Sequence, residues 1–155
     1  MDLVRTASLI AATIANGLMA GLFFAFTFAV MPGLARTADR TFVESMQRIN
    51  VAILNGWFLT CFLGALALSA AAAAVHLRNG APFFWALAGF ILYAATFLIT
   101  IRLNVPLNDQ LNAATLDNTE SARTQFEPAW IRWNTIRTAT SVAAFGCLVA
   151  ALVVQ

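Results

Sequence analysis

One stretch of the chain carries side chains whose types and spacing could do chemistry. Trp130, Trp133, Asn134, Arg137 and Ser141 follow one another at helical intervals, so they share one face of a helix. Indole rings are suited to holding a flat apolar molecule, and the amide and guanidinium donate hydrogen bonds to an oxygen that gains negative charge. Asn134 and Arg137 are therefore catalytic candidates, and the two tryptophans are candidates for substrate binding.

Two other helices are expected to bring polar side chains to the level of that face. Six residues lie at the start of the second apolar segment or at the end of the third: Asn50, Asn55, Trp57, Arg102, Asn104 and Asn108. Arg102 is the third catalytic candidate, and the other five are expected to bind the substrate. Side chains from three helices at one level predict a polar pocket with aromatic walls.

The first apolar segment offers a further wall. Thr13, Asn16, Phe23, Phe24 and Thr27 share one broad helical face. The two phenylalanines would form a flat apolar wall for a planar or lipid-like ligand, and the polar side chains would bond to other helices. Packing in the core is the simpler interpretation of most of these residues.

Other kinds of site are not indicated by the sequence. His76 is the only histidine, and no group of Cys, His, Asp and Glu has metal-ligand spacing, so we predict no metal and no cofactor. There is no Gly-rich phosphate loop and no Ser-His-Asp set. The formal net charge is only +2 and forms no basic patch, so we expect no nucleic-acid partner.

The composition assigns these residues to a membrane protein. Hydrophobic residues make up 61% of the 155-residue chain and charged residues only 10%, whereas a soluble domain has about 25% charged residues. So few charges cannot cover a water-soluble surface. The length suits a single domain, residues 1–155, whose partners are the bilayer and a hydrophobic small molecule or lipid.

Four apolar segments are long enough to cross the bilayer, which takes about 20 helical residues. They comprise approximately residues 7–31, 51–75, 83–101 and 129–154. Pro32 and Pro106 are expected to end the first and third helices, and Pro128 to begin the fourth. Residues 35–50 are predicted to form a short amphipathic interfacial helix, and residues 104–127 a polar loop.

These segments predict an all-α fold, an integral membrane up-down four-helix bundle. The interfacial helix and the polar loop then lie on one face of the membrane. Seven of the nine arginines lie on that face, which the positive-inside rule assigns to the cytoplasm. Because heavy use of Ala and Arg without Lys is typical of GC-rich bacterial genomes, we expect a multi-pass protein of a bacterial cytoplasmic membrane.

Two features also have interpretations that involve no ligand. Tryptophan at a membrane surface often forms only an aromatic belt, and arginine near a helix end often extends toward the lipid headgroups. Gly17 and Gly21, followed by Ala25 and Ala29, form a stripe of small residues that lets helices pack closely. A homo-oligomer through Gly17 and Gly21 is the alternative to packing within one bundle.

Four motifs resemble the anthrone oxygenase-like family of small four-span membrane proteins, long catalogued as a domain of unknown function. They are Gly21-Leu-Phe-Phe-Ala-Phe ending at Met31-Pro32-Gly33, the segment from Asn50 to Trp57, Asn104-Val-Pro-Leu-Asn108, and Trp130-x-x-Trp133-Asn134-x-x-Arg137. The resemblance covers nearly the whole chain.

The resemblance implies an oxidoreductase that turns anthrones into anthraquinones without a metal or flavin, a monooxygenase whose substrate enolate reacts directly with O₂. Trp57, Trp130 and Trp133 would then hold the rings. The developing oxyanion would be stabilised by the polar candidates Arg102, Asn104, Asn134 and Arg137. No residue stands out as the base, and by elimination the candidates are Glu44, Asp109 and Glu127.

Two non-catalytic functions remain open alongside oxygenase chemistry. A protein that binds lipids or quinones, or an accessory protein for a membrane partner, needs the same apolar bundle and pocket but no base. A structural helper would dimerise through Gly17 and Gly21 and leave the pocket residues as a membrane belt.

Overall fold

All the regular secondary structure of the described residues is helical. The computed structural model describes the backbone from Asp2 to Gln155 and the side chains from Leu3 onward, and within that range no strand is present. The helices are α1 (Asp2–Ala25), η1 (Phe26–Val30), α2 (Met31–Leu34), α3 (Asp39–Ala52), α4 (Gly56–Val75), α5 (Ala81–Ile99), η2 (Thr100–Asn104), α6 (Val105–Asn112) and α7 (Thr119–Val153). The segments η1 and η2 are π-helical turns.

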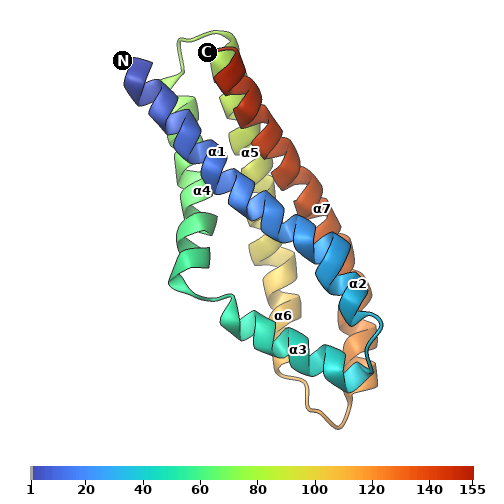
Figure 1. Ribbon diagram of the computed structural model, residues 1–155. Helices are drawn as coiled ribbons and strands as arrows, with labels where there is room; N and C mark the ends of the chain where they lie inside the picture. Colours follow the sequence, from blue (N-terminus) through green and yellow to red (C-terminus); the bar gives the residue numbers. More distant parts are fainter. Residues whose placement is uncertain (1) are drawn as a thin grey trace.

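Four of these helices are long and apolar enough to cross a membrane. They comprise Leu3–Leu34, Gly56–Val75, Ala81–Asn112 and Thr119–Val153. This confirms the predicted multi-pass four-helix bundle. Both termini and the turn between α4 and α5 lie at one end, the terminal end, whereas α3 and the turn between α6 and α7 lie at the other, the loop end (Figure 1).

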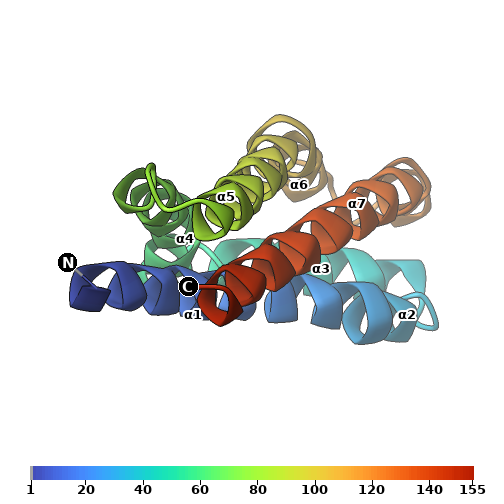
Figure 2. The same cartoon turned by 90° about the horizontal axis from the view of Figure 1, so that it is seen from above.

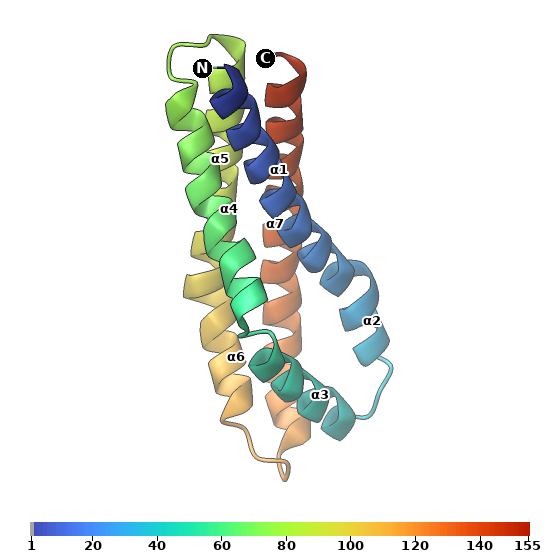
Figure 3. The ribbon, with the colours of Figure 1, turned by 60° about the vertical axis from the view of Figure 1, so that its left-hand side comes forward.

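The first helix crosses the bundle obliquely. It starts beside α4 at the terminal end and reaches α7 at the loop end (Figure 1). Seen from above, α1 and α2 extend in one line along one side of the bundle (Figure 2). Since α1 and α4 therefore diverge toward the loop end, α3 connects them by running across that end of the molecule (Figure 3).

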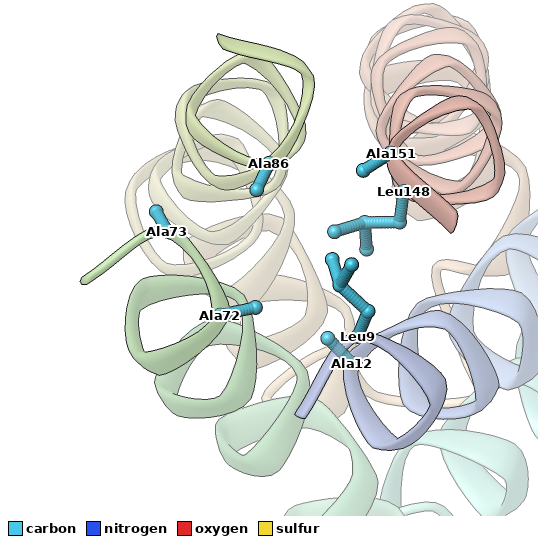
Figure 4. Close-up of a cluster of buried hydrophobic side chains, with 7 residues drawn as sticks. All are labelled: Leu9, Ala12, Ala72, Ala73, Ala86, Leu148 and Ala151. Atoms are coloured by element: carbon cyan, nitrogen blue, oxygen red, sulfur yellow. The ribbon is translucent and has the colours of Figure 1, made fainter. Parts of the chain in front are cut away.

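The terminal end is packed with small side chains. Its core is formed by Leu9, Ala12, Ala72, Ala73, Ala86, Leu148 and Ala151, which point into the centre of the bundle from all four helices (Figure 4). Gly89 of α5 lies so close to α7 that a Cβ atom there would be 3.0 Å from Cγ of Leu148. Small residues allow this close approach, because van der Waals contact holds helices together in lipid.

The helices continue past the prolines that were expected to bound them. α1, η1 and α2 run without a break to Leu34, and α5, η2 and α6 run to Asn112, so the predicted ends at Pro32 and Pro106 are wrong. Pro128 lies inside α7 rather than at its beginning. The predicted polar loop is therefore mostly helical, and only residues 113–118 connect α6 to α7.

The π-helical turns explain why two prolines are tolerated. A proline ring collides with the carbonyl four residues before it and provides no N–H group. For Pro32 and Pro106 that carbonyl lies within η1 or η2. In a π-helical turn, a backbone N–H bonds to the carbonyl five residues earlier, as the N–H of Met31 does to the carbonyl of Phe26. The wider turn moves the backbone aside and leaves room for each ring.

The predicted amphipathic helix exists as α3, but its apolar face is covered by protein. Phe42, Val43 and Met46 of α3 are fully buried against side chains of α6 and α7, among them Leu111 and Phe126. The helix therefore closes the loop end of the bundle.

The small-residue stripe is partly used within the chain. A Cβ atom at Gly17 would lie 3.1 Å from the ring of Phe145 in α7, whereas nothing lies within 4 Å of such an atom at Gly21. Gly17 therefore packs against α7, whereas Gly21, Ala25 and Ala29 are exposed.

Candidate functional site

A cavity of about 220 Å³ lies between the helices at the loop end. Every membrane-crossing helix and α3 contribute to its wall. The lining residues are Leu22, Phe23, Phe26, Ile49, Asn50, Ile53, Leu54, Phe58, Leu59, Phe62, Thr100, Ile101, Val105, Asn108, Trp130 and Arg137. Twelve of these sixteen residues are aromatic or aliphatic, and the other four are Asn50, Thr100, Asn108 and Arg137.

Arg137 is the only charged side chain on that wall, and it is 7% exposed. Its Nε atom donates to Oδ1 of Asn134 over 2.9 Å. Its guanidinium carbon lies 4.3 Å from the ring centroid of Phe23 and 5.2 Å from that of Trp130. No described residue accepts a hydrogen bond from its two terminal amino groups, and no carboxylate pairs with it. Its charge is therefore supported by aromatic rings and one amide.

Asn134 holds that guanidinium in place. Its Nδ2 atom donates to Oγ1 of Thr27 over 2.7 Å and to the carbonyl of Phe23 over 3.3 Å. The Thr27 hydroxyl also bonds to that of Thr138, over 2.9 Å. Because the Phe23 carbonyl can only accept, the Asn134 carbonyl must face Arg137. The network joins η1 to α7 and fixes the direction of the cation.

Trp130 closes the side of the cavity next to Arg137. Its Nε1 atom donates to Oδ1 of Asn108 over 2.8 Å, and its ring lies 5.7 Å from that of Phe26 and 6.0 Å from that of Phe126. With its polar atom bonded, the indole presents an apolar surface to the cavity.

Asn104, the last residue of η2, is fully buried at the same level. Neither its amide oxygen nor its amide nitrogen has a partner among the described residues. Its level along α7 lies between two hydrogen bonds that join α7 to α5 or α6, one between Thr96 and Thr140 and one from Trp130 to Asn108. Burying such groups without a partner costs roughly 1–3 kcal/mol each. Asn104 belongs to a π-helical turn, and such turns occur often at functional sites.

Comparison with known families decides the classification of the chain. The family described as Anthrone oxygenase matches residues 57–147, more than half of the chain. The chain belongs to the anthrone oxygenase family. It matches no curated protein and no solved structure.

The family match divides the cavity of this anthrone oxygenase family member into two parts. The matched segment includes Asn108, Trp130 and Arg137, and with them the partner residue Asn134. The side chains that α1, η1 and α3 contribute lie outside it. The cation and its immediate partners on α7 are thus in the family segment.

Six of the ten predicted site residues of this family member do not line the cavity, and three of them have a local reason. Trp57 is 86% exposed near the start of α4. Asn55 caps that helix, since its Oδ1 atom accepts from the Phe58 N–H over 3.0 Å. Arg102 is exposed because its neighbours Thr100 and Asn104 face inward.

The remaining candidates lie in the cavity wall or close to it. Asn50 and Asn108 line the cavity, and Nδ2 of Asn50 donates to Oδ1 of Asn112 over 3.2 Å. Trp133 is half-buried outside the cavity, with the Arg132 guanidinium 5.3 Å from its ring.

The carboxylates considered as bases lie elsewhere. Glu44 pairs with Arg40 over 2.9 Å, and Glu127 pairs with Arg123 over 2.6 Å. Asp109 is exposed. None of the three lines the cavity, and no three metal-ligating His, Cys, Asp or Glu side chains gather within the described part of the chain.

Sequence reasoning missed several aromatic residues of the wall. Phe58 and Phe62 stack with centroids 5.4 Å apart, and Phe62 stacks on Phe97 at 5.0 Å. Their spacing of four residues on one helix was an available signal, because such residues share a face. Phe26 had no comparable signal, since its direction depends on the π-helical turn.

Proposed function

We propose that this protein is a cofactor-independent, anthrone oxygenase-like monooxygenase that acts on a hydrophobic aromatic substrate. One observation carries the proposal: the buried Arg137 guanidinium faces an apolar cavity and has no carboxylate partner among the described residues. Such a cation is available to a substrate anion. Family membership supports the reaction type, and we place the protein in the cytoplasmic membrane of a bacterium.

The chemistry requires an anion that the cavity can stabilise. An anthrone loses a proton from its methylene carbon and becomes an enolate, with negative charge on oxygen. That carbon then adds O₂ and a proton to give a hydroperoxide, which loses water to form the quinone carbonyl. Each turnover consumes one O₂, places one of its atoms in the quinone and releases the other as water.

Arg137 and Asn134 act on the first of these steps. The terminal amino groups of Arg137 donate to the enolate oxygen, and Asn134 keeps them aimed without reorganisation. Phe23 and Trp130 flank the guanidinium and hold the rings beside it. Because no carboxylate or imidazole of the described residues lines the cavity, the proton passes to a water molecule inside the cavity.

The test is oxygen uptake by the protein reconstituted in lipid nanodiscs and supplied with anthrone. We expect one O₂ consumed per anthraquinone formed, faster than in empty nanodiscs, and one labelled atom in the quinone when ¹⁸O₂ is used. A rate equal to that of empty nanodiscs would reject the proposed activity.

The missing base favours a second candidate, a non-catalytic protein that binds lipids or quinones. It would use the same cavity, with Arg137 bonded to a carbonyl or phenol oxygen of the ligand. Mass spectrometry of molecules extracted from the purified protein distinguishes the two. A quinone that copurifies and is returned unchanged in the presence of O₂ supports binding alone.

A further inference from the structure

The cavity opens through a gap with aliphatic edges in the side of the bundle. Among its lining side chains, only Leu54, Leu59, Ile101 and Val105 are exposed, between 38% and 67%. We call these four residues the window. Two lie at or just before the start of α4, and two lie in η2 and α6. Because none is polar, the window suits lipid rather than water.

The loop end beside the window is closed by α3. Nε2 of Gln47 donates to the carbonyls of Leu111 and Ala114, over 2.8 and 3.1 Å. These bonds fasten α3 to the end of α6 at the loop end (Figure 3). Phe42 and Met46 of α3 are fully buried there. A ligand coming from that side would have to displace this helix.

Arg123 of α7 fastens the segment that leads into α3. Its guanidinium donates to the carbonyls of Ala35 and Thr37 and to the carboxylate of Asp39, each over 2.9 Å. It also lies 4.6 Å from the ring centroid of Phe42. Helix α3 and the segment that leads into it are therefore both held against the bundle by several hydrogen bonds.

The residues next to the window indicate its depth in the membrane. Leu59 and Ile101 lie within membrane-crossing helices. The exposed Trp57 and Arg102 are their near neighbours in sequence. Tryptophan and arginine are typical of the membrane surface, where a ring or a long side chain meets the headgroups. The window therefore opens just inside the hydrocarbon region.

We infer that the cavity is loaded from the bilayer through the window by an aromatic compound with an enolisable carbonyl or acidic hydroxyl, part of which stays in the lipid. The inference rests on the proposed function for the group that meets Arg137. An apolar cavity of about 150 Å³ accommodates benzene. A volume of about 220 Å³ therefore encloses little more than a compact ring system. Further rings or chains extend through the window.

The route can be measured with 2-hydroxyanthraquinone as the probe, because it carries an acidic hydroxyl and needs no oxidation. In nanodiscs, a variant with Trp57, Trp85 and Trp133 replaced by Phe retains Trp130 as the reporter on the cavity wall. Stopped-flow quenching of Trp130 then gives association and dissociation rates. The double variant Leu59→Phe, Ile101→Phe narrows the window from both edges.

We expect the double variant to slow association by about tenfold or more and to slow dissociation as well, as narrowing of a passage does. The matched control is Leu63→Phe with Ile91→Phe, two exposed residues of the same helices outside the cavity wall. Its rates should equal those of the reporter variant.

Three outcomes would overturn the inference. Unchanged rates in the window variant are the first, and an absence of quenching in the reporter variant is the second. The third is faster association in Gln47→Ala or Arg123→Ala, which would place access beneath α3. If 2-hydroxyanthraquinone binds but anthrone is not oxidised, the proposed activity is rejected while the window has still been tested, so the two failures are distinguishable.

Discussion

The same four helices pack closely at one end of the bundle and enclose a cavity at the other. At the terminal end, alanines and leucines bring the helices into contact and leave the core fully buried (Figure 4). At the loop end, phenylalanines, Trp130 and the crossing of α1 hold the helices apart around a cavity that contains Arg137. This difference shows that a bundle whose one end is tightly packed can contain, at its other end, a buried cation that has no counterion.

The energetic contrast between the ends follows from what each buries. Small apolar side chains in close contact form the core of the terminal end, where the buried His76 bonds to the carbonyl of Ala72 in α4. A buried cation without a counterion destabilises the loop end, because its desolvation is only partly offset by rings and one amide.

The largest effect among the supporting residues is expected at Asn134. Asn134→Ala removes the acceptor that aims Arg137 and the donor to Thr27, so kcat for anthrone should fall by about 10²-fold. Oxygen uptake at saturating anthrone measures it. Asn134→Gln retains an amide acceptor and donor and should recover part of the rate. Equal loss in both variants would indicate a structural role only.

A paired change at glycine tests the close packing of the terminal half. Gly89→Ala forces a contact with Leu148 and should destabilise the protein by about 1–3 kcal/mol. Gly64→Ala has open space and should instead stabilise α4 by up to about 1 kcal/mol, because alanine favours helix. Thermal unfolding in detergent compares them. Equal effects would contradict the packing difference.

The smallest effect is expected at Asn55. Asn55→Ala removes the cap of α4 and should lower stability by about 1 kcal/mol without changing the rate of anthrone oxidation. Thermal unfolding and oxygen uptake on one preparation measure both. A large loss of turnover would show that Asn55 belongs to the site after all.

The sequence predicted the bundle well because its signals are periodic and long. Apolar segments of about 20 residues identify membrane helices without any tertiary information. Their ends were predicted less well, because Pro32 and Pro106 usually stop a helix and the π-helical turns before them depend on packing. Pro128 likewise lies within a helix that continues.

The site was predictable where one helix carries it. Trp130, Asn134 and Arg137 share a face of α7 by spacing alone, and the structure brings their side chains together. Trp57 was expected at the correct depth but faces outward, because depth along a helix does not give direction across it. The contribution of Thr27 to Asn134 depends on how α1 crosses α7 and has no sequence signal.

The most direct test of the account compares three arginine variants in one assay. Oxygen uptake with anthrone is measured for Arg137→Gln, Arg137→Lys and the exposed control Arg132→Gln, together with thermal unfolding. We predict that Arg137→Gln lowers kcat by about 10²- to 10³-fold without lowering the unfolding temperature, that Arg137→Lys retains part of the rate, and that the control matches the wild type. Full activity in Arg137→Gln, or loss of activity that only follows loss of fold, would contradict the central role of this cation.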